Sequence, residues 1–356
     1  MKGENCQRDN RSLAPVREAG QTGASPRGVA GSSVSPIRLS EKAQRLLAAV
    51  LTACAIVLAW APPSHGAPIT FVTALPVAQD QLVWRNYFDP GYKGDDPTSD
   101  NRDLWNLLYN PVFAWGPSAD LAIFASLTPQ YSFLGENTPQ GRISQSAGGL
   151  GDSLIFARYT AYFKDWLGKT LRIDPLAGIY IPTGWYNKSD IYGRLPQDMQ
   201  GGSGSVDPYF GLTTMWKTQL DELDWDITYR YNPAASSGYQ LGNSFHTDFA
   251  WYRRVVPWIL PDQGLDNQIW VGLETNLIRD GGNRVSGAFD GTTGGFVWYL
   301  DPGIFYGTPF WTTGMAVQVP VVQQLNGPGR LYGSFRLFLY FEYYFMMPSL
   351  PEWAQF

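Results

Sequence analysis

Hydrophobic and polar positions alternate along the last apolar stretch of the chain, residues 330–345. Read at period two, one face carries only apolar and aromatic side chains, namely Leu337, Leu339, Phe341, Tyr343 and Phe345. The opposite face includes Arg336 and Glu342. This pattern is typical of a membrane-crossing strand, which needs about 9 to 11 residues, with a buried strand of a soluble sandwich as the alternative. Because a lone strand leaves backbone groups unpaired in lipid, the preceding chain has to complete a closed barrel.

Apolar segments of similar length recur from residue 67 onward, and the linkers between them alternate between long and short. Outer-membrane barrels show this alternation because short turns join their strands on the periplasmic side and long loops join them outside. The pattern predicts an all-β fold, a closed antiparallel transmembrane β-barrel of about 12 strands, within a range of about 10 to 14. The predicted strands are residues 79–88, 104–115, 121–133, 151–163, 171–182, 205–216, 223–231, 243–253, 267–276, 293–303, 310–319 and 331–345.

The linkers complete this plan. Long loops are predicted at 89–103, 134–150, 183–204, 232–242, 277–292 and 320–330. Short turns are predicted at 116–120, 164–170, 217–222 and 304–309. One further linker, 254–266, is too long for a turn of this pattern.

The predicted strand at 223–231 shows the alternation most clearly. Asp224, Asp226, Thr228 and Arg230 share one face, and the other face is apolar and aromatic. An arginine facing lipid at mid-depth costs about 2 to 4 kcal/mol, so we expect the charged face to line the interior. The same parity gives the candidate residues of a transport path through the lumen, which are Arg158, Arg172, Asp174, Tyr180, Asp207, Tyr209, Asp226, Arg230, His246, Asp248, Trp270, Glu274, Arg336 and Glu342.

The first 66 residues follow a different pattern. Residues 1–40 are rich in Gly, Ser and Arg and cannot bury a core, so they are expected to be disordered or to lie upstream of the true start. Residues 41–66 have the order of a secretory signal peptide, with an apolar run at 46–61 and a cleavage site between Gly66 and Ala67. An alternative is lipidation at Cys54, because Leu51-Thr52-Ala53-Cys54 resembles a lipobox. The mature protein would then consist of the barrel, 67–345, and a C-terminal tail, 346–356.

This organisation predicts the outer membrane of a Gram-negative bacterium as the location. The expected partners are the lipid bilayer, lipopolysaccharide, the barrel-assembly machinery and a small-molecule solute, with the barrel itself a monomer. A net charge of -5 and 15% aromatic residues argue against nucleic acid as a partner. Both cysteines, Cys6 and Cys54, precede the predicted cut, so the mature chain offers no thiol or disulfide chemistry.

Catalytic and metal chemistry find little support in the sequence, and no cofactor is predicted. The histidine of the mature chain, His246, shares a strand face with Asp248, but the sequence places no serine beside it, so a hydrolase is a minor alternative. The acidic run at 221–226 lacks the spacing of a calcium loop and is expected to form a solvated turn. Four aspartates near 95–103 are expected to be solvated loop residues, with cation binding as the alternative.

Three glycine-rich motifs resemble those of a known family. They are GGLGDSLIFARY at 148–159, GIYIPTG at 178–184 and GSGSVDPYFG at 202–211. In this order and spacing they resemble the outer-membrane family named after the MetA pathway of phenol degradation, whose members are commonly labelled transporters. The resemblance implies a barrel associated with aromatic catabolism and implies no catalytic residues. We expect the glycines to permit positive φ or a bulge, and Asp152 to cap its own turn.

The expected function is uptake of small hydrophobic or aromatic compounds. Eight-stranded barrels are filled by side chains and those of about 16 to 18 strands hold water channels, so twelve strands leave an intermediate bore. Inward aromatics such as Tyr180, Tyr209 and Trp270, beside inward charges, suit an aromatic solute with a polar group. The alternatives are that these aromatics simply fill the barrel, or that a structural barrel or adhesin acts through its loops.

The charges of the last strand need partners on other strands. Arg336 and Glu342 are too far apart along one strand to pair with each other. If the barrel closes, Glu342 is expected to meet Arg85 or Gln81 of the first strand. We therefore predict that Glu342→Gln lowers barrel stability or alters conductance, whereas Glu274→Gln, near a strand end, has a smaller effect.

Overall fold

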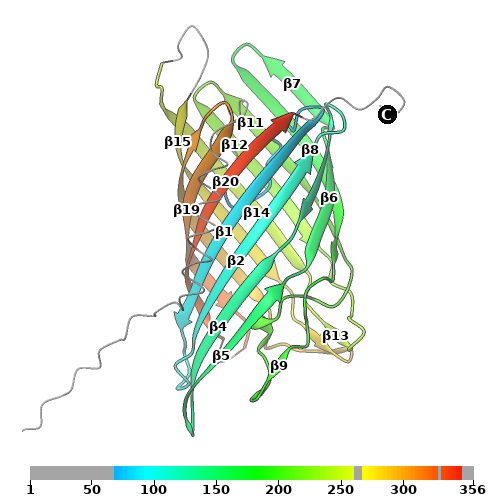
Figure 1. The fold of residues 1–356 in the computed structure, drawn as a ribbon, viewed down its shortest axis with the longest axis vertical. Coiled ribbons are helices and arrows are strands. Elements are labelled where there is room, and N and C mark those ends of the chain that lie inside the picture. The colour runs from blue at the N-terminus through cyan, green and yellow to red at the C-terminus, as the bar shows by residue number, and fades with distance from the viewer. Residues whose placement is uncertain (1–67, 260–266, 328–329, 347–356) are drawn as a thin grey trace, which may run out of the picture. The chain divides into compact units, whose positions relative to one another are not determined.

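The wall of the barrel is a closed antiparallel sheet (Figure 1). The computed structural model describes residues 68–259, 267–327 and 330–346. Of the 15 strands in the main sheet, β4, β5 and β7 continue wall strands, which leaves a ring of 12 and confirms the predicted strand number. The ring comprises β1 (Gln81–Asp95), β2 (Asp103–Trp115), β3 (Leu121–Ser126), β6 (Ser153–Tyr159), β8 (Lys169–Ile181), β11 (Asp207–Thr218), β12 (Asp221–Arg230), β14 (Ser244–Val256), β15 (Gln268–Asp280), β18 (Gly295–Gly307), β19 (Trp311–Leu325) and β20 (Tyr332–Met346).

Neighbouring strands of the ring are joined alternately at its two ends. Short turns at 116–120, 167–168, 219–220 and 308–310 lie at one end, the upper end in Figure 1, which we call the turn end. The opposite loop end carries two small sheets, β9 (Ser189–Asp190) with β10 (Gly193–Arg194), and β13 (Tyr239–Gln240) with β16 (Arg284–Val285) and β17 (Ala288–Phe289). The short helix η1 (Gln197–Met199) is also there. Among the described residues, no helix has the length and apolarity needed to cross a membrane.

Several strands continue further toward the loop end than the sequence predicts. β1 reaches Asp95, β15 reaches Asp280 and β19 reaches Leu325. The predicted loop at 134–150 is wrong, because it forms the end of β4 (Pro129–Thr138) and all of β5 (Gly141–Leu150), which pair as a hairpin. The extension of β1 and the hairpin are mostly polar and contain several glycines. Alternation of apolar residues is required only where a strand faces lipid, so a sequence pattern based on lipid contact ends too early.

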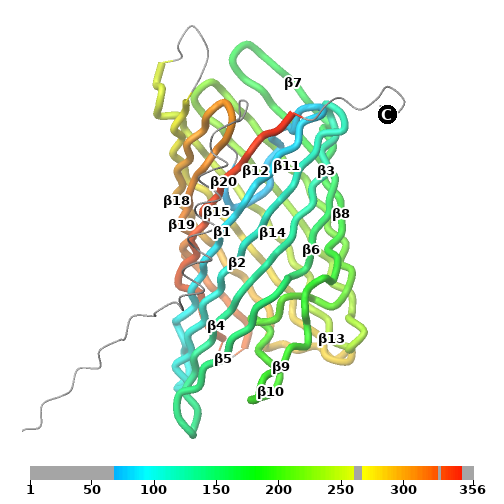
Figure 2. Tube along the Cα trace, in the orientation of Figure 1, coloured from blue at the N-terminus to red at the C-terminus, as the bar shows by residue number. Residues whose placement is uncertain are grey.

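The segment before the first strand lies inside the barrel. Ile69 and Phe71 belong to one buried cluster with inward side chains of β14, β15 and β18, and Val77 belongs to a second cluster near the turn end. Sequence analysis predicted no structure for residues 67–78. Figure 2 shows how the strands surround this interior. The predicted upstream extension, signal peptide and Cys54 site, the end of linker 254–266 and most of the C-terminal tail lie outside the described residues.

The glycine-rich motif at 148–151 permits a close crossing of two chain segments. In the described structure β5 pairs only with β4, and residues 182–206 cross beside its other edge. A Cβ atom on Gly149 would lie 2.1 Å from Nε1 of Trp185, and Lys188 Nζ donates to the Gly148 carbonyl at 3.0 Å. Close approach of another segment is therefore the reason for glycine here.

Asp152 also serves the crossing segment. Its carboxylate accepts the backbone N–H of Gly184 at 3.3 Å and of Ser203 at 2.8 Å. Asp152 therefore holds the loop after β8 in place and does not cap its own turn, contrary to the sequence-based expectation.

Closure of the ring brings Arg85 opposite Glu342, which confirms the predicted pairing of the first and last strands. Arg85 Nε and Nη2 donate to the two carboxylate oxygens at 2.9 and 2.8 Å. The Glu342 side chain is 2% exposed and that of Arg85 is 17% exposed. This bidentate pair joins β1 to β20 from the inside of the barrel.

We predict that Glu342→Gln destabilises the barrel by about 3 to 5 kcal/mol, because it leaves the Arg85 guanidinium largely buried without its counter-charge. The measurement is the midpoint of urea unfolding of the refolded protein in detergent micelles. Unfolding is detected by the change in gel mobility of unboiled samples. The matched control is Asp221→Asn, which breaks the more exposed pair with Arg253 and is expected to cost less than about 1 kcal/mol. Equal midpoints for the two variants would contradict the prediction.

Candidate functional site in the barrel lumen

Glu274 fixes the start of the inner segment, residues 68–80, to the barrel wall. Its Oε1 accepts the backbone N–H of Ile69 at 2.7 Å, and its Oε2 accepts that of Thr70 at 2.9 Å. The hydroxyls of Thr70 and Tyr252 donate to the same carboxylate, which is 0% exposed. Glu274 lies in the middle of β15, so the expectation that it sits near a strand end is wrong.

Further along the inner segment, two charged residues of the wall, Asp224 and Arg158, bind it. The Thr73 hydroxyl donates to Asp224, and Arg158 donates to the carbonyls of Thr73 and Leu75. Arg158 also pairs with Asp174 at 3.2 Å, and both side chains are almost fully buried. The sequence indicated Arg158 and Asp174 as transport candidates. In the structure they help to attach the inner segment to the wall.

Aromatic side chains pack around the segment in the turn-end half of the lumen. Trp270 stacks on Phe305 at a centroid distance of 5.8 Å, and both belong to the buried cluster that includes Ile69 and Phe71. Trp270 therefore fits the alternative hypothesis that the inward aromatic side chains fill the barrel. Tyr180 and Tyr209 lie farther toward the loop end, edge to face at 5.6 Å.

Most of the remaining charged candidates have partners on other strands. Arg230 pairs with Asp207 and, at 3.2 Å, with Asp152, and its guanidinium lies 3.9 Å from the centre of the Tyr180 ring. Arg336 pairs with Asp89 and donates to Gln318 at 3.2 Å. Two further candidates form no salt bridge with any described residue. The guanidinium of Arg172 lies 4.2 Å from the Phe163 ring centre, and Asp226 is directly opposite Asp248.

His246 has a serine neighbour that the sequence did not indicate. Its Nε2 lies 2.9 Å from Oγ of Ser244, two residues away on the same strand. The Ser244 hydroxyl donates to Oδ1 of Asp280 at 2.5 Å. The serine hydrogen is therefore engaged with a carboxylate and not with the imidazole, which is not the arrangement that activates a nucleophile.

Asp96, one of the aspartates considered as a cation site, is engaged within its own loop. Asp96 accepts two hydrogen bonds from the Arg102 guanidinium, at 2.9 and 2.8 Å, and the N–H and hydroxyl of Thr98 donate to the same carboxylate. The Arg102 side chain is the main reason that the pKa of Asp96 lies well below its usual range. In the run 221–226, Glu222, Asp224 and Asp226 are almost fully buried on the inward face of β12, so the expected solvated turn is wrong.

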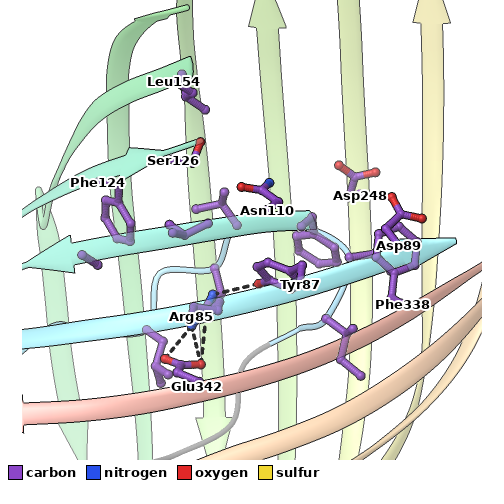
Figure 3. Close-up of a pocket in the computed structure, with 18 of the residues that line it drawn as sticks. Arg85, Tyr87, Asp89, Asn110, Phe124, Ser126, Leu154, Asp248, Phe338 and Glu342 are labelled. Atoms are coloured by element: carbon purple, nitrogen blue, oxygen red, sulfur yellow. Dashed lines mark hydrogen bonds and ion pairs between the residues drawn. The ribbon is translucent and has the colours of Figure 1, made fainter. Parts of the chain in front are cut away.

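A cavity of about 360 Å³ lies beside the inner segment, between the wall strands β1, β2, β3, β6 and β20 and the strands β14, β15 and β19. One end is lined by apolar side chains, including Val83, Val112, Phe124, Leu154 and Phe156. The other end is lined by polar side chains, including Asp89, His246, Asp248, Asn276 and Gln318. Figure 3 shows this separation, with Phe124 and Leu154 on one side and Asp89 and Asp248 on the other. We call this cavity the inner chamber.

A second cavity of about 410 Å³ lies at the loop end and is more polar. Tyr180, Tyr209, Arg230 and Arg330 contribute to its lining. His246 lines both this cavity and the inner chamber, so it lies where the two adjoin. Sequence analysis did not predict most residues of the chamber wall, including Asp89, Asn110, Phe124, Phe156 and Gln318. Asp89 was assigned to a loop, and the uncharged residues carry no charge that would mark the inward face of their strands.

Comparison with known proteins agrees with this architecture. Residues 103–327 match the family described as "Putative MetA-pathway of phenol degradation". The crystal structure of the COG4313 outer membrane channel from Pseudomonas putida F1 superimposes with a TM-score of 0.57 at 13% sequence identity, covering 79% of this chain and 100% of that chain. The β-domain of the Bordetella autotransporter BrkA gives 0.39 at 12% identity, covering 74% and 99%. No curated protein matches the chain at a significant level.

We predict that Glu274→Gln increases ion current through the barrel in planar lipid bilayers, because a neutral amide accepts the hydrogen bonds of Ile69 and Thr70 less strongly than a carboxylate does. Current steps should become larger or more frequent than in the wild-type protein. The control is Glu222→Gln, since Glu222 is equally buried but pairs with Lys217 of the neighbouring strand. Unchanged current in Glu274→Gln, or an equal change in both variants, would refute this role of Glu274.

Proposed function

Because the chain belongs to the family named after the MetA pathway of phenol degradation, we propose that it is an outer-membrane channel for the uptake of small hydrophobic and aromatic compounds. The observation that carries this proposal is the inner chamber. Strands of the barrel wall and the inner segment surround it, and apolar side chains line one of its ends. Ligand sites of this kind combine a largely apolar lining with a few polar groups.

The arrangement of the two cavities supports a path from the loop end inward. The loop-end cavity is polar and adjoins the inner chamber at His246. A solute entering from outside would leave water in the first cavity and transfer its apolar part into the second. Such transfer is favourable by about 25 cal/mol per Å² of apolar surface removed from water. A wide aqueous pore would lack this step and would not select apolar solutes.

A hydrolytic function of the same barrel is less well supported. The Ser244 hydroxyl donates to Asp280, and His246 lies between two cavities rather than beside an activated serine. We therefore place His246 in the lining of the path. Replacement by alanine is expected to alter flux and to leave any background ester hydrolysis unchanged.

The proposal predicts slow growth of a deletion strain on limiting concentrations of an aromatic carbon source that the wild-type strain consumes. At saturating concentration the difference should vanish, because diffusion across the outer membrane is then sufficient. Growth on succinate provides the control, and a plasmid carrying the intact gene should restore wild-type growth. Equal growth of both strains on a panel of aromatic and aliphatic compounds would refute uptake and favour a structural or adhesive role.

A further inference from the structure

The cationic groups that line the inner chamber are all engaged by the protein itself. Arg85 donates to both oxygens of Glu342 and, at 3.2 Å, to the Tyr87 hydroxyl. Arg158 pairs with Asp174 and donates to two carbonyls of the inner segment. The third, Arg336, pairs with Asp89 and donates to Gln318. An anionic ligand would therefore have to displace an internal carboxylate from each guanidinium that it approached.

Hydrogen-bond acceptors of the chamber are less completely engaged. Asp248 lines the chamber, is 4% exposed, and its Oδ1 receives no hydrogen bond from any described residue. Oδ1 of Asn110, which lines the same chamber from β2, is also buried without a donor. Buried polar atoms normally have partners, and an acceptor without one is costly. Asn110 reaches the chamber from β2 and Asp248 from β14, two strands on opposite sides of the ring.

We infer that the inner chamber selects solutes that have an apolar body and one hydrogen-bond-donating head, a hydroxyl or an amine, and that it disfavours carboxylates. This inference rests on the proposed function and specifies its substrate class. The head would donate a hydrogen bond to Asp248, or alternatively to Asn110 on the opposite side, and the apolar body would occupy the end lined by Phe124, Leu154 and Phe156. A carboxylate head would instead meet the acceptor Asp248, and the arginines of the lining are already paired with internal carboxylates.

The selectivity has a physical basis in desolvation. A hydroxyl or amine that leaves water must find an acceptor in the chamber, and Asp248 supplies one that the fold leaves open. A methyl ether of the same shape gives up no donor, but it leaves Oδ1 of Asp248 without a hydrogen bond. Sites built around a buried hydrogen-bonding group therefore discriminate against analogues that lack the complementary group.

The test uses the full chain in lipid nanodiscs and four probes that share a propylphenyl body. These are 4-propylphenol, 4-propylbenzylamine, the methyl ether 4-propylanisole and 4-propylbenzoate. Binding is measured by calorimetry, with protein-free nanodiscs as the blank for partition into lipid. The phenol and the amine are expected to bind about tenfold more tightly than the ether, and the benzoate more weakly than the ether. Comparison of phenol with amine distinguishes a hydroxyl head from an ammonium head.

Variants of Asp248 test whether this residue causes the preference for a hydrogen-bond-donating head. Asp248→Leu should abolish the preference for phenol over ether, whereas Asp248→Asn, which keeps an acceptor of the same shape, should retain that preference and weaken the amine. If Asp248→Leu does not fold, the loss of amine binding in Asp248→Asn still tests the role of the carboxylate. The matched control is Asp301→Asn, because Asp301 is equally buried in β18 and does not line the chamber.

Three outcomes would count against the inference. Equal affinity for phenol and ether, or tightest binding of the benzoate, would overturn it and leave uptake of hydrophobic compounds standing. An amine affinity that is unchanged in Asp248→Asn would remove Asp248 as the acceptor. Binding of no probe above the lipid blank would overturn both the inference and the proposed function.

Discussion

Pairing of every backbone N–H and C=O group is the constraint on which this structure depends. A strand that crosses lipid has no water to satisfy its edges, so the sheet has to close on itself. In this chain the closure joins β1 to β20, and the bidentate pair between Arg85 and Glu342 lies on the inner side of that seam. Closure of twelve strands creates an interior too wide to be filled by the wall side chains alone and narrow enough for one additional segment.

The inner segment fills this space through polar contacts as well as apolar ones. A chain that lies inside a barrel cannot pair with wall strands whose backbone groups are already used. Side chains therefore take the place of a strand neighbour: Glu274 accepts N–H groups of the segment, and Arg158 donates to its carbonyls. The charged residues of the lumen that the sequence indicated for transport include these attachments. Charge inside a barrel can thus serve to hold a segment rather than to contact a solute.

The seam between the first and last strands could be predicted because two simple rules determine it. Side chains alternate at period two, and an antiparallel ring places the first strand beside the last, so Glu342 has few possible partners. The inner segment could not be predicted, since residues 67–78 show no alternation and two prolines interrupt them. The end of β4 and all of β5 were missed because their residues are mostly polar or glycine and lack an apolar period. The contact of Glu274 with Ile69 depends on the path of a segment that no local pattern encodes.

The depth of the inner segment has a consequence for the order of events in assembly. Ile69 and its partner Glu274 are separated by 205 residues, and Arg85 and Glu342 by 257. The first described residues of the chain therefore reach their final contacts only after most of the chain has been delivered to the membrane. Contacts between such distant residues form slowly, because the chain must lose the freedom of the long intervening loop. The inner segment is thus among the last parts of the described chain to become ordered, because the wall strands that hold it have to be in place first.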